Sequence, residues 1–116
     1  MNSLNFEQGD IIVADLIFSE QVGAKRRPAL VISNTKYNQT SDDIVVLKIT
    51  SKGHSTEFDV GLDQSHLLSG EIKTESQIMT DNPATVYKKM AQIKIAQITP
   101  AKLTEVKTKL KRLYGL

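Results

Sequence analysis

The spacing of the hydrophobic residues changes once along this chain, at Thr99-Pro100, and that change limits what the chain can fold into. Before it, short runs rich in Ile and Val are separated by polar segments, which is typical of β-strands. After it, apolar residues recur at steps of three and four, at Leu103, Val106, Leu110 and Leu113, and this predicts one amphipathic helix. The pattern favours a mainly β fold, a small and strongly bent barrel or sandwich with a C-terminal helix packed on it.

The boundaries of these elements can also be predicted. Thr99 suits the helix N-cap, Pro100 suits the first helical position, and Gly115 stands where a helix ends. The expected strands are residues 11–18, 29–33, 44–50, 57–60, 71–75, 77–80 and 91–98. Between them we expect a polar turn region at 35–43, a connection at 62–70 and a turn at Asp81-Asn82-Pro83.

Composition narrows the class of protein. A chain of 116 residues with 40% hydrophobic and 24% charged residues predicts one globular domain, residues 1–116. The chain has no cysteine, which excludes disulfides and thiolate metal sites. This composition is compatible with the cytoplasm, where we expect the protein to act. No apolar run approaches the roughly 18 residues of a membrane span. Because the net charge is only +2, nucleic-acid binding would have to come from local basic patches.

One such patch is Lys25-Arg26-Arg27, which runs through Pro28 into the apolar segment Leu30-Val31-Ile32. The segment predicts a buried strand, with the proline at its start, where a missing N–H costs little. Arg27 would then stand at the end of a rigid element, which suits recognition of a phosphate or a carboxylate. The alternative is that the three cations form only a solvated turn.

The order of these signals resembles a known family, the MazF/PemK toxins, which are the ribonuclease half of toxin–antitoxin pairs. The resemblance covers the chain from about residue 7 to its end. The matching motifs are Gly9-Asp10-Ile11-Ile12-Val13, Ser19-Glu20-Gln21, Arg27-Pro28-Ala29-Leu30-Val31-Ile32, Ile49-Thr50-Ser51, Phe58-Asp59-Val60, Ile95-Ala96-Gln97-Ile98-Thr99 and Leu113-Tyr114-Gly115-Leu116.

The resemblance implies an SH3-like barrel, a homodimer and metal-independent cleavage of single-stranded RNA without a cofactor, inhibited by a cognate antitoxin. It implies that Arg27 handles the scissile phosphate and that Thr50 lies close to it. RNA-binding residues would be Ser51, Lys25, Arg26 and Glu20. The loop of residues 19–24 would be the place where an acidic antitoxin binds.

Lys73 and Glu75 match an arginine and an aspartate that some members of the family use. If both lay on one strand face, Glu75 would be the best carboxylate to deprotonate the 2′-hydroxyl of RNA. The alternative is a solvent-facing charged pair on that strand, and a lysine cannot form the bidentate fork of an arginine. His54 and His66, the two histidines, are interpreted as loop residues at the surface, and they form no metal-ligand pattern.

Two other functions remain open. The first is a binding protein on the same barrel, as are the CcdB toxins, which poison DNA gyrase. The second is a weakened RNA-binding module, which the lysine at position 73 would permit. The Arg27–Thr50 combination favours the nuclease, because the first alternative has no use for it.

Overall fold

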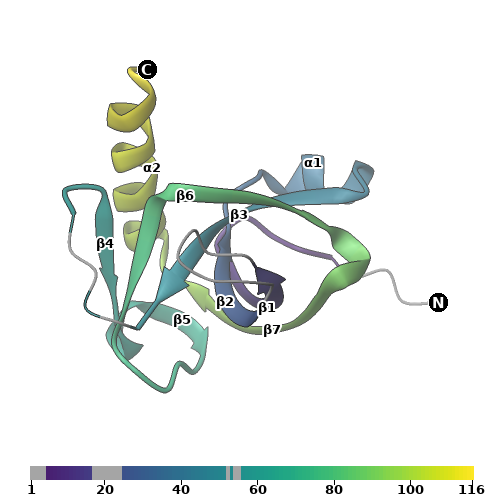
Figure 1. The fold of residues 1–116 in the computed structure, drawn as a ribbon, viewed down its shortest axis with the longest axis horizontal. Helices are drawn as coiled ribbons and strands as arrows, with labels where there is room; N and C mark the ends of the chain where they lie inside the picture. The colour runs from purple at the N-terminus through teal and green to yellow at the C-terminus, as the bar shows by residue number, and fades with distance from the viewer. Residues whose placement is uncertain (1–4, 17–24, 52, 54–55) are drawn as a thin grey trace.

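The computed structural model describes residues 5–16, 25–51, 53 and 56–116. Figure 1 shows strands curled around one another, with one long helix at the side. The strands are β1 (Asp10–Leu16), β2 (Lys25–Val31), β3 (Asp43–Thr50), β4 (Asp59–Leu62), β5 (Leu67–Gly70), β6 (Ser76–Tyr87) and β7 (Ala91–Ile98). The helices are α1 (Thr35–Thr40) and α2 (Pro100–Tyr114), with short 3₁₀ turns η1 (Gln64–His66) and η2 (Lys88–Met90).

All strand pairs are antiparallel, and they form one sheet in the order β4-β6-β3-β2-β1-β7-β5. The sheet is curled into a half-barrel, which confirms the mainly β prediction with a C-terminal helix. The expected strand at 44–50 is confirmed as β3, and the one at 91–98 as β7. Among the described residues, no helix has the length and apolar character that crossing a membrane requires.

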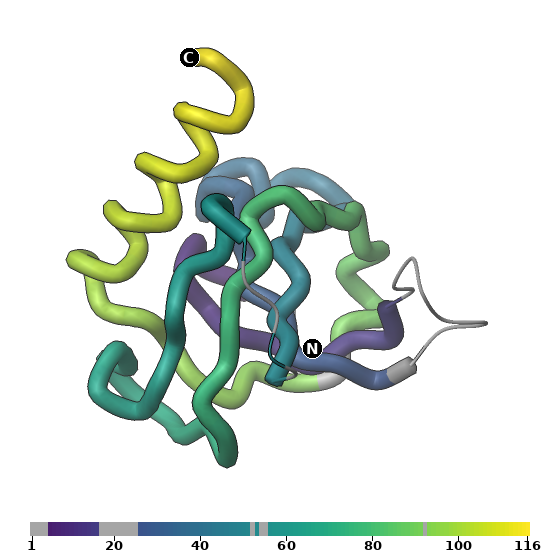
Figure 2. The backbone as a smooth tube through the Cα atoms, turned by 60° about the vertical axis from the view of Figure 1, so that its left-hand side comes forward, coloured from purple at the N-terminus to yellow at the C-terminus, as the bar shows by residue number. Residues whose placement is uncertain are grey.

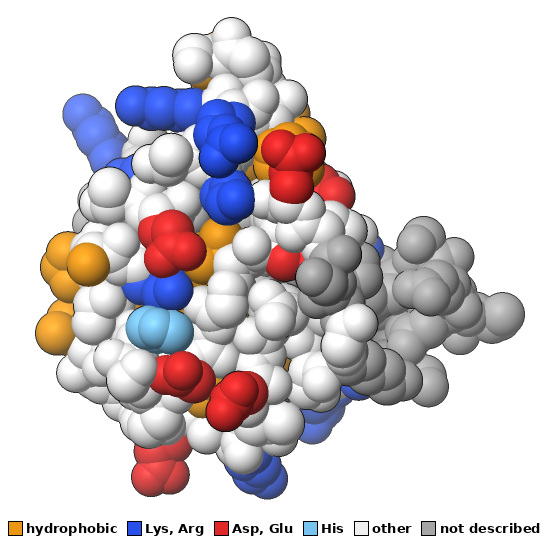
Figure 3. Space-filling model, turned by 90° about the vertical axis from the view of Figure 1, so that its left-hand side faces the viewer, with side chains coloured by type: hydrophobic (Ala, Val, Ile, Leu, Met, Phe, Trp, Pro, Cys, Tyr) orange, Lys and Arg blue, Asp and Glu red, His pale blue; other side chains and the backbone are white. Residues whose placement is uncertain are grey.

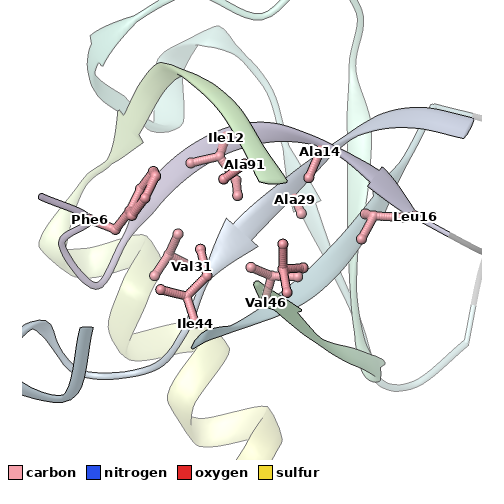
Figure 4. Close-up of a cluster of buried hydrophobic side chains, with 10 residues drawn as sticks. Phe6, Ile12, Ala14, Leu16, Ala29, Val31, Ile44, Val46 and Ala91 are labelled. Atoms are coloured by element: carbon pink, nitrogen blue, oxygen red, sulfur yellow. The ribbon is translucent and has the colours of Figure 1, made fainter. Parts of the chain in front are cut away.

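Two clusters of buried side chains lie on the two faces of the curled sheet. The first is drawn in Figure 4, where side chains from β1, β2, β3 and β7 point toward one another. It contains Phe6, Ile12, Ala14, Leu16, Ala29, Val31, Ile44, Val46, Val86 and Ala91. The second contains Ile11, Leu30, Leu47, Ile49, Val60, Leu62, Ile78, Ala96, Ile98 and Val106. Because β1, β2 and β3 contribute alternate residues to both clusters, cluster membership reports which face a side chain occupies.

Helix α2 covers the second cluster. Val106 is fully buried, and Leu103 and Leu110 pack partly buried against this cluster, so the predicted apolar stripe is confirmed as packing for these three residues. Leu113, the fourth residue of the stripe, belongs to neither cluster. The Thr99 hydroxyl caps the first turn by accepting the Lys102 N–H at 3.2 Å. Gly115 ends the helix in the left-handed conformation, as predicted. The last turns extend beyond the sheet (Figure 2).

Strand β2 differs from its prediction. It begins at Lys25 rather than Ala29, so Pro28 lies inside the strand and not at its start. The pairing explains why a proline is tolerated there. Strand β2 pairs with β3 only from Ala29 to Val31, while residues 25–28 pair with β1. Pro28 therefore lies just past the last β2–β3 pair, where one side of the strand lacks a neighbour.

The predicted turn at Asp81-Asn82-Pro83 is wrong, because these residues lie within the continuous strand β6. They mark a bulge instead. Leu47 pairs with Pro83 and Ile49 pairs with Ile78, so two steps along β3 correspond to five along β6. The turn-forming residues are accommodated by three extra residues that bend the strand rather than reverse it.

Three polar segments also differ from expectation. The turn region at 35–43 contains α1, whose N-cap is the Asn34 side chain accepting the Tyr37 N–H at 2.7 Å. The connection at 62–70 contains η1 and the edge strand β5. Residues 71–75, expected as a strand, are the loop between β5 and β6. Alternation of polar and apolar residues there reflects Ile72 packing against the second cluster rather than sheet pairing.

Candidate active site

The strands β2 and β3 part at one end of the sheet. Their last pair is Ala29 with Lys48; beyond it β2 continues along β1 and β3 continues along β6. The β2–β3 register, carried two residues further in each strand, sets Arg27 opposite Thr50. The residues of the two motifs Arg27-Pro28 and Thr50-Ser51 therefore lie where the strands separate.

Arg27 and Thr50 also share a face of the sheet. Arg27 pairs with Ala14, and directly paired residues of antiparallel strands point the same way, so Arg27 follows Ala14 and Ala29 to the first-cluster face. On β3, Ile44 and Val46 occupy that face and Thr50 follows them in alternation. Both side chains are half-buried, and each interacts with other groups of the chain.

The neighbouring cations do not share this position. Arg26 is exposed and, by the same alternation, lies on the face opposite Arg27. For Lys25 the structure describes the backbone, in β2, but not the side chain. Glu20 and the loop 19–24 lie outside the described residues, as does His54.

Two cavities adjoin the place where the strands part. The larger, of about 410 Å³, is mainly apolar; Ile11, Val13, Pro28, Ile49, Ile72 and Ile95 line it, and Lys73 stands at its wall. The smaller, of about 260 Å³, is a polar cleft lined by Thr50, Ser51, Gly53, Gly61, Leu62, Asp63, His66, Glu75, Ser76 and Gln77. Ser51, Leu62 and Ser76 belong to both linings, so they form a common wall.

Lys73 and Glu75 are separated by this wall. The prediction that they share a strand face is wrong, because both lie in the loop of residues 71–75. Lys73 lines the apolar cavity and Glu75 lines the polar cleft together with Thr50. No ion pair joins the two side chains in the described part of the chain, and both are exposed. The structure thus associates Glu75, but not Lys73, with the cleft beside Thr50.

His66 lines the polar cleft, although the sequence indicated only a surface loop residue. It is half-buried and is the last residue of η1. Its Nδ1 accepts the backbone N–H of Asp63 at 3.0 Å, and the Asp63 carboxylate accepts the backbone N–H of Ser65 at 2.8 Å. The sequence signal was the spacing Asp63-x-x-His66, an aspartate N-cap with a side-chain acceptor at the third helical position, as in a capping box.

Among the described residues, the carboxylates that line the cleft are those of Asp63 and Glu75. Hydrogen bonds from the Ser65 hydroxyl and N–H lower the pKa of Asp63 below its usual value, so this carboxylate stays ionised. Figure 3 shows this side of the molecule, with acidic and basic side chains around a histidine. Within residues 5–16, 25–51, 53 and 56–116, no three His, Asp or Glu side chains group in a way that could hold a metal ion.

Comparisons with known proteins agree with this architecture. The structure resembles an endoribonuclease from a mycobacterial species (22% identity, TM-score 0.78, covering 97% of this chain and 94% of that one). It also resembles a mycobacterial endoribonuclease solved with its cognate antitoxin (23% identity, TM-score 0.77, 95% of each chain). A third similar structure is the MazE–MazF complex of Deinococcus radiodurans (25% identity, TM-score 0.73, covering 98% of this chain and 99% of that one).

The comparison with curated protein sequences found no match. The family model of PemK-like and MazF-like toxins of type II toxin–antitoxin systems matches residues 7–114, nearly the whole chain. The resemblance inferred from the motifs is thereby confirmed, and the chain belongs to the PemK/MazF-like toxin family of type II toxin–antitoxin systems.

Proposed function

We propose that this protein is a toxin endoribonuclease that acts in the cytoplasm and cleaves single-stranded RNA, with mRNA as its substrate. A cognate antitoxin would inhibit it. Membership of the toxin family supports the toxin role, and two of the similar structures are described as endoribonucleases. The observation that carries the proposal is the common face of Arg27 and Thr50 at the parting of β2 and β3. A fixed cation beside a hydroxyl is suited to a phosphate group.

The proposed reaction uses the nucleophile that RNA itself carries. The 2′-hydroxyl attacks the adjacent phosphorus, the bond to the 5′-oxygen breaks, and the products are a 2′,3′-cyclic phosphate and a 5′-hydroxyl. Arg27 would stabilise the extra negative charge of the phosphorane, because its guanidinium is always charged and carries several donors. The hydroxyls of Thr50 and Ser51 would donate to the phosphate oxygens. A metal ion is not required when these groups supply the charge and the donors.

A base must remove the proton of the 2′-hydroxyl. Glu75 remains our candidate for it, because it lines the cleft that Thr50 also lines. Lys73 lies across the wall, in the apolar cavity. Lys73, predicted with the catalytic residues, is therefore proposed instead as a contact of the RNA chain. Lys25 and Arg26 stay proposed RNA contacts, because positive side chains attract phosphates. Glu20 stays a proposed RNA contact as a hydrogen-bond acceptor.

Two protein partners are part of the proposal. The first is an antitoxin, since toxins of this fold have been solved with theirs, the mycobacterial endoribonuclease and the Deinococcus MazF among them. The second is another copy of this chain. Its support is the exposed apolar surface: Met90 is 55% and Ile93 58% exposed, and both lie at or next to the start of β7. Surface of this kind favours association.

The test is cleavage of a long single-stranded RNA by the purified protein, alone and with the protein encoded by the neighbouring reading frame. We expect cleavage by the wild type, cleavage slower by about 10²–10³ by Arg27→Ala, and inhibition by the neighbouring protein. RNA that stays intact with a folded wild-type protein would contradict the nuclease and favour a binding function. A cleavage rate of Arg27→Ala equal to that of the wild type would contradict the proposed role of Arg27 in the active site.

A further inference from the structure

The polar cleft beside Thr50 holds side chains whose hydrogen-bonding capacity the fold does not use. Within the described residues, the side chains of Glu75 and Gln77 form no hydrogen bond or ion pair with another residue, and both line the cleft. Leu62 adds an apolar surface at its wall. A cleft with a few convergent polar groups on an apolar surface is the usual form of a small-molecule or base subsite.

Among the side chains that line this cleft, His66 is the one whose tautomer can be inferred from a hydrogen bond. Its Nδ1 is an acceptor, since it receives the Asp63 N–H at 3.0 Å. The neutral imidazole therefore carries its proton on Nε2. An imidazolium would direct an Nδ1–H at the Asp63 N–H and lose this bond. This hydrogen bond favours the tautomer in which Nε2–H is the free donor of His66, and such a donor is suited to binding an oxygen atom.

The charges nearby decide what kind of oxygen this donor can bind. Glu75 and Asp63 both line the cleft, and Asp63 Oδ1 lies 3.6 Å from His66 Nδ1. Lys102 of α2 is not part of the lining and pairs with Glu105 at 2.9 Å, although its charge contributes to lowering the pKa of Asp63. Two carboxylates repel a phosphate group. An uncharged carbonyl oxygen of a nucleobase meets no such repulsion, and unstacked bases of single-stranded RNA are read through their edges.

We propose that this cleft binds the base of a nucleotide next to the scissile phosphate, and that His66 Nε2–H donates a hydrogen bond to a carbonyl oxygen of that base. Uracil, cytosine and guanine carry such an oxygen, and adenine does not. His66 is then a residue that determines base preference. The inference rests on the proposed RNA substrate and adds to it a subsite and a rule for which base occupies it.

Two substitutions separate the donor from the structural role of His66. Glutamine and glutamate are the usual residues at this position of a capping box, because either side chain can accept the N-cap N–H. His66→Gln keeps that acceptor and keeps an N–H donor for the cleft. His66→Glu keeps the acceptor but replaces the donor with a carboxylate. Thr104→Glu, on the exposed side of α2 and outside the cleft lining, controls for an added negative charge.

The measurement is binding of fluorescent ten-nucleotide oligo(U), oligo(C) and oligo(A), each 2′-O-methylated so that it cannot be cleaved. We expect the wild type and Thr104→Glu to bind oligo(U) and oligo(C) roughly 3- to 10-fold more tightly than oligo(A), the range of one net hydrogen bond. His66→Gln should retain most of the preference and His66→Glu should lose it, with melting temperatures like that of the wild type.

Equal wild-type affinity for the three oligonucleotides, or a preference that His66→Glu retains, would overturn the inference. A second readout does not depend on the variants: the imidazole ¹⁵N spectrum of the free protein should show Nε2 protonated and Nδ1 unprotonated, and the Hε2 resonance should shift with oligo(U). A protonated Nδ1 would also overturn it. Cleavage of long RNA by the same preparation tests the proposed function separately. A nuclease without base preference would cleave this RNA but bind the three oligonucleotides equally. A binding protein would show the base preference without cleaving the RNA.

Discussion

Arg27 of β2 and Thr50 of β3 point to the same face of the sheet, two residues beyond the last pair that joins their strands, Ala29 with Lys48. In an unbroken ladder such residues would be direct cross-strand neighbours. Because β2 follows β1 and β3 follows β6 from this point, the ladder opens where these two side chains stand. An opening in a sheet gives a phosphate access to side chains that remain fixed by rigid strands.

The first prediction concerns Arg27. Arg27→Ala should lower the cleavage rate by about 10²–10³, the usual cost of losing an electrostatic donor to the transition state. Arg27→Lys should recover little of it, because a point charge replaces a planar fork. The matched control is Arg26→Ala, which removes an exposed cation on the opposite face and should weaken RNA binding without a comparable loss in rate. Single-turnover kinetics distinguish the two, and equal losses of rate would argue against the assignment of faces.

The second prediction concerns Gly70, which ends β5 just before the loop that lines both cavities. Its φ is +82°, and a Cβ there would lie 2.1 Å from the Ile95 carbonyl oxygen. Gly70→Ala should lower the free energy of unfolding by about 2–4 kcal/mol, from the left-handed strain and the clash together. Gly61→Ala is the control, because a Cβ at Gly61 meets nothing within 4 Å. Denaturant unfolding measures the free energy of unfolding of both variants. Equal values for Gly70→Ala and Gly61→Ala would refute the predicted strain and clash at Gly70.

The third prediction is a pH dependence of the η1 cap. Hydrogen bonds from Ser65 lower the pKa of Asp63 in the folded protein below its ordinary value of about 3.9. The resulting stabilisation is complete above that ordinary value and is lost as the pH falls through the lowered folded pKa. An NMR titration of the Asp63 carboxyl carbon should therefore show a midpoint below that of an aspartate in an unstructured peptide. A midpoint at or above the peptide value would exclude the cap.

The fourth prediction is a homodimer in solution. The exposed side chains of Met90 and Ile93 are large and apolar, and burial by a second copy would remove them from water. Sedimentation velocity at micromolar concentration should give the mass of two chains. Ile93→Lys should shift the equilibrium toward the monomer, whereas Lys107→Ala on α2 should not. A wild-type monomer under these conditions would remove the dimer from the proposal.

Much of this fold follows from local sequence signals. The strand of residues 44–50 is rich in β-branched residues, and the cap, first turn and end of α2 each have a residue typical of that position. Each of these features depends only on residues that are close to it in the chain, so it can be predicted from the sequence. The motifs that contain Arg27 and Thr50 could also be recognised in the sequence, whereas their common face depends on pairing between distant strands. Their catalytic roles stay predictions.

Other features depend on contacts that the sequence does not display. Asp81-Asn82-Pro83 favours a turn locally, but pairing with β3 on one side holds these residues in a bulged strand. Residues 71–75 alternate as a strand would, yet they have no place in the ladder, so the expected Lys73–Glu75 face does not exist. That His66 lines a cleft could not be predicted, because residues of β4, β6 and η1 form this cleft together.

The most direct test of the account is cleavage of single-stranded RNA by the wild-type protein in excess EDTA, with analysis of the product ends. The account predicts undiminished cleavage, 2′,3′-cyclic phosphate and 5′-hydroxyl ends, and a rate about 10²–10³ lower for Arg27→Ala. This outcome follows if Arg27 and Thr50 supply the charge and donors and the RNA supplies its 2′-hydroxyl. Loss of cleavage in EDTA that magnesium restores, or products with a 5′-phosphate, would contradict the proposed mechanism.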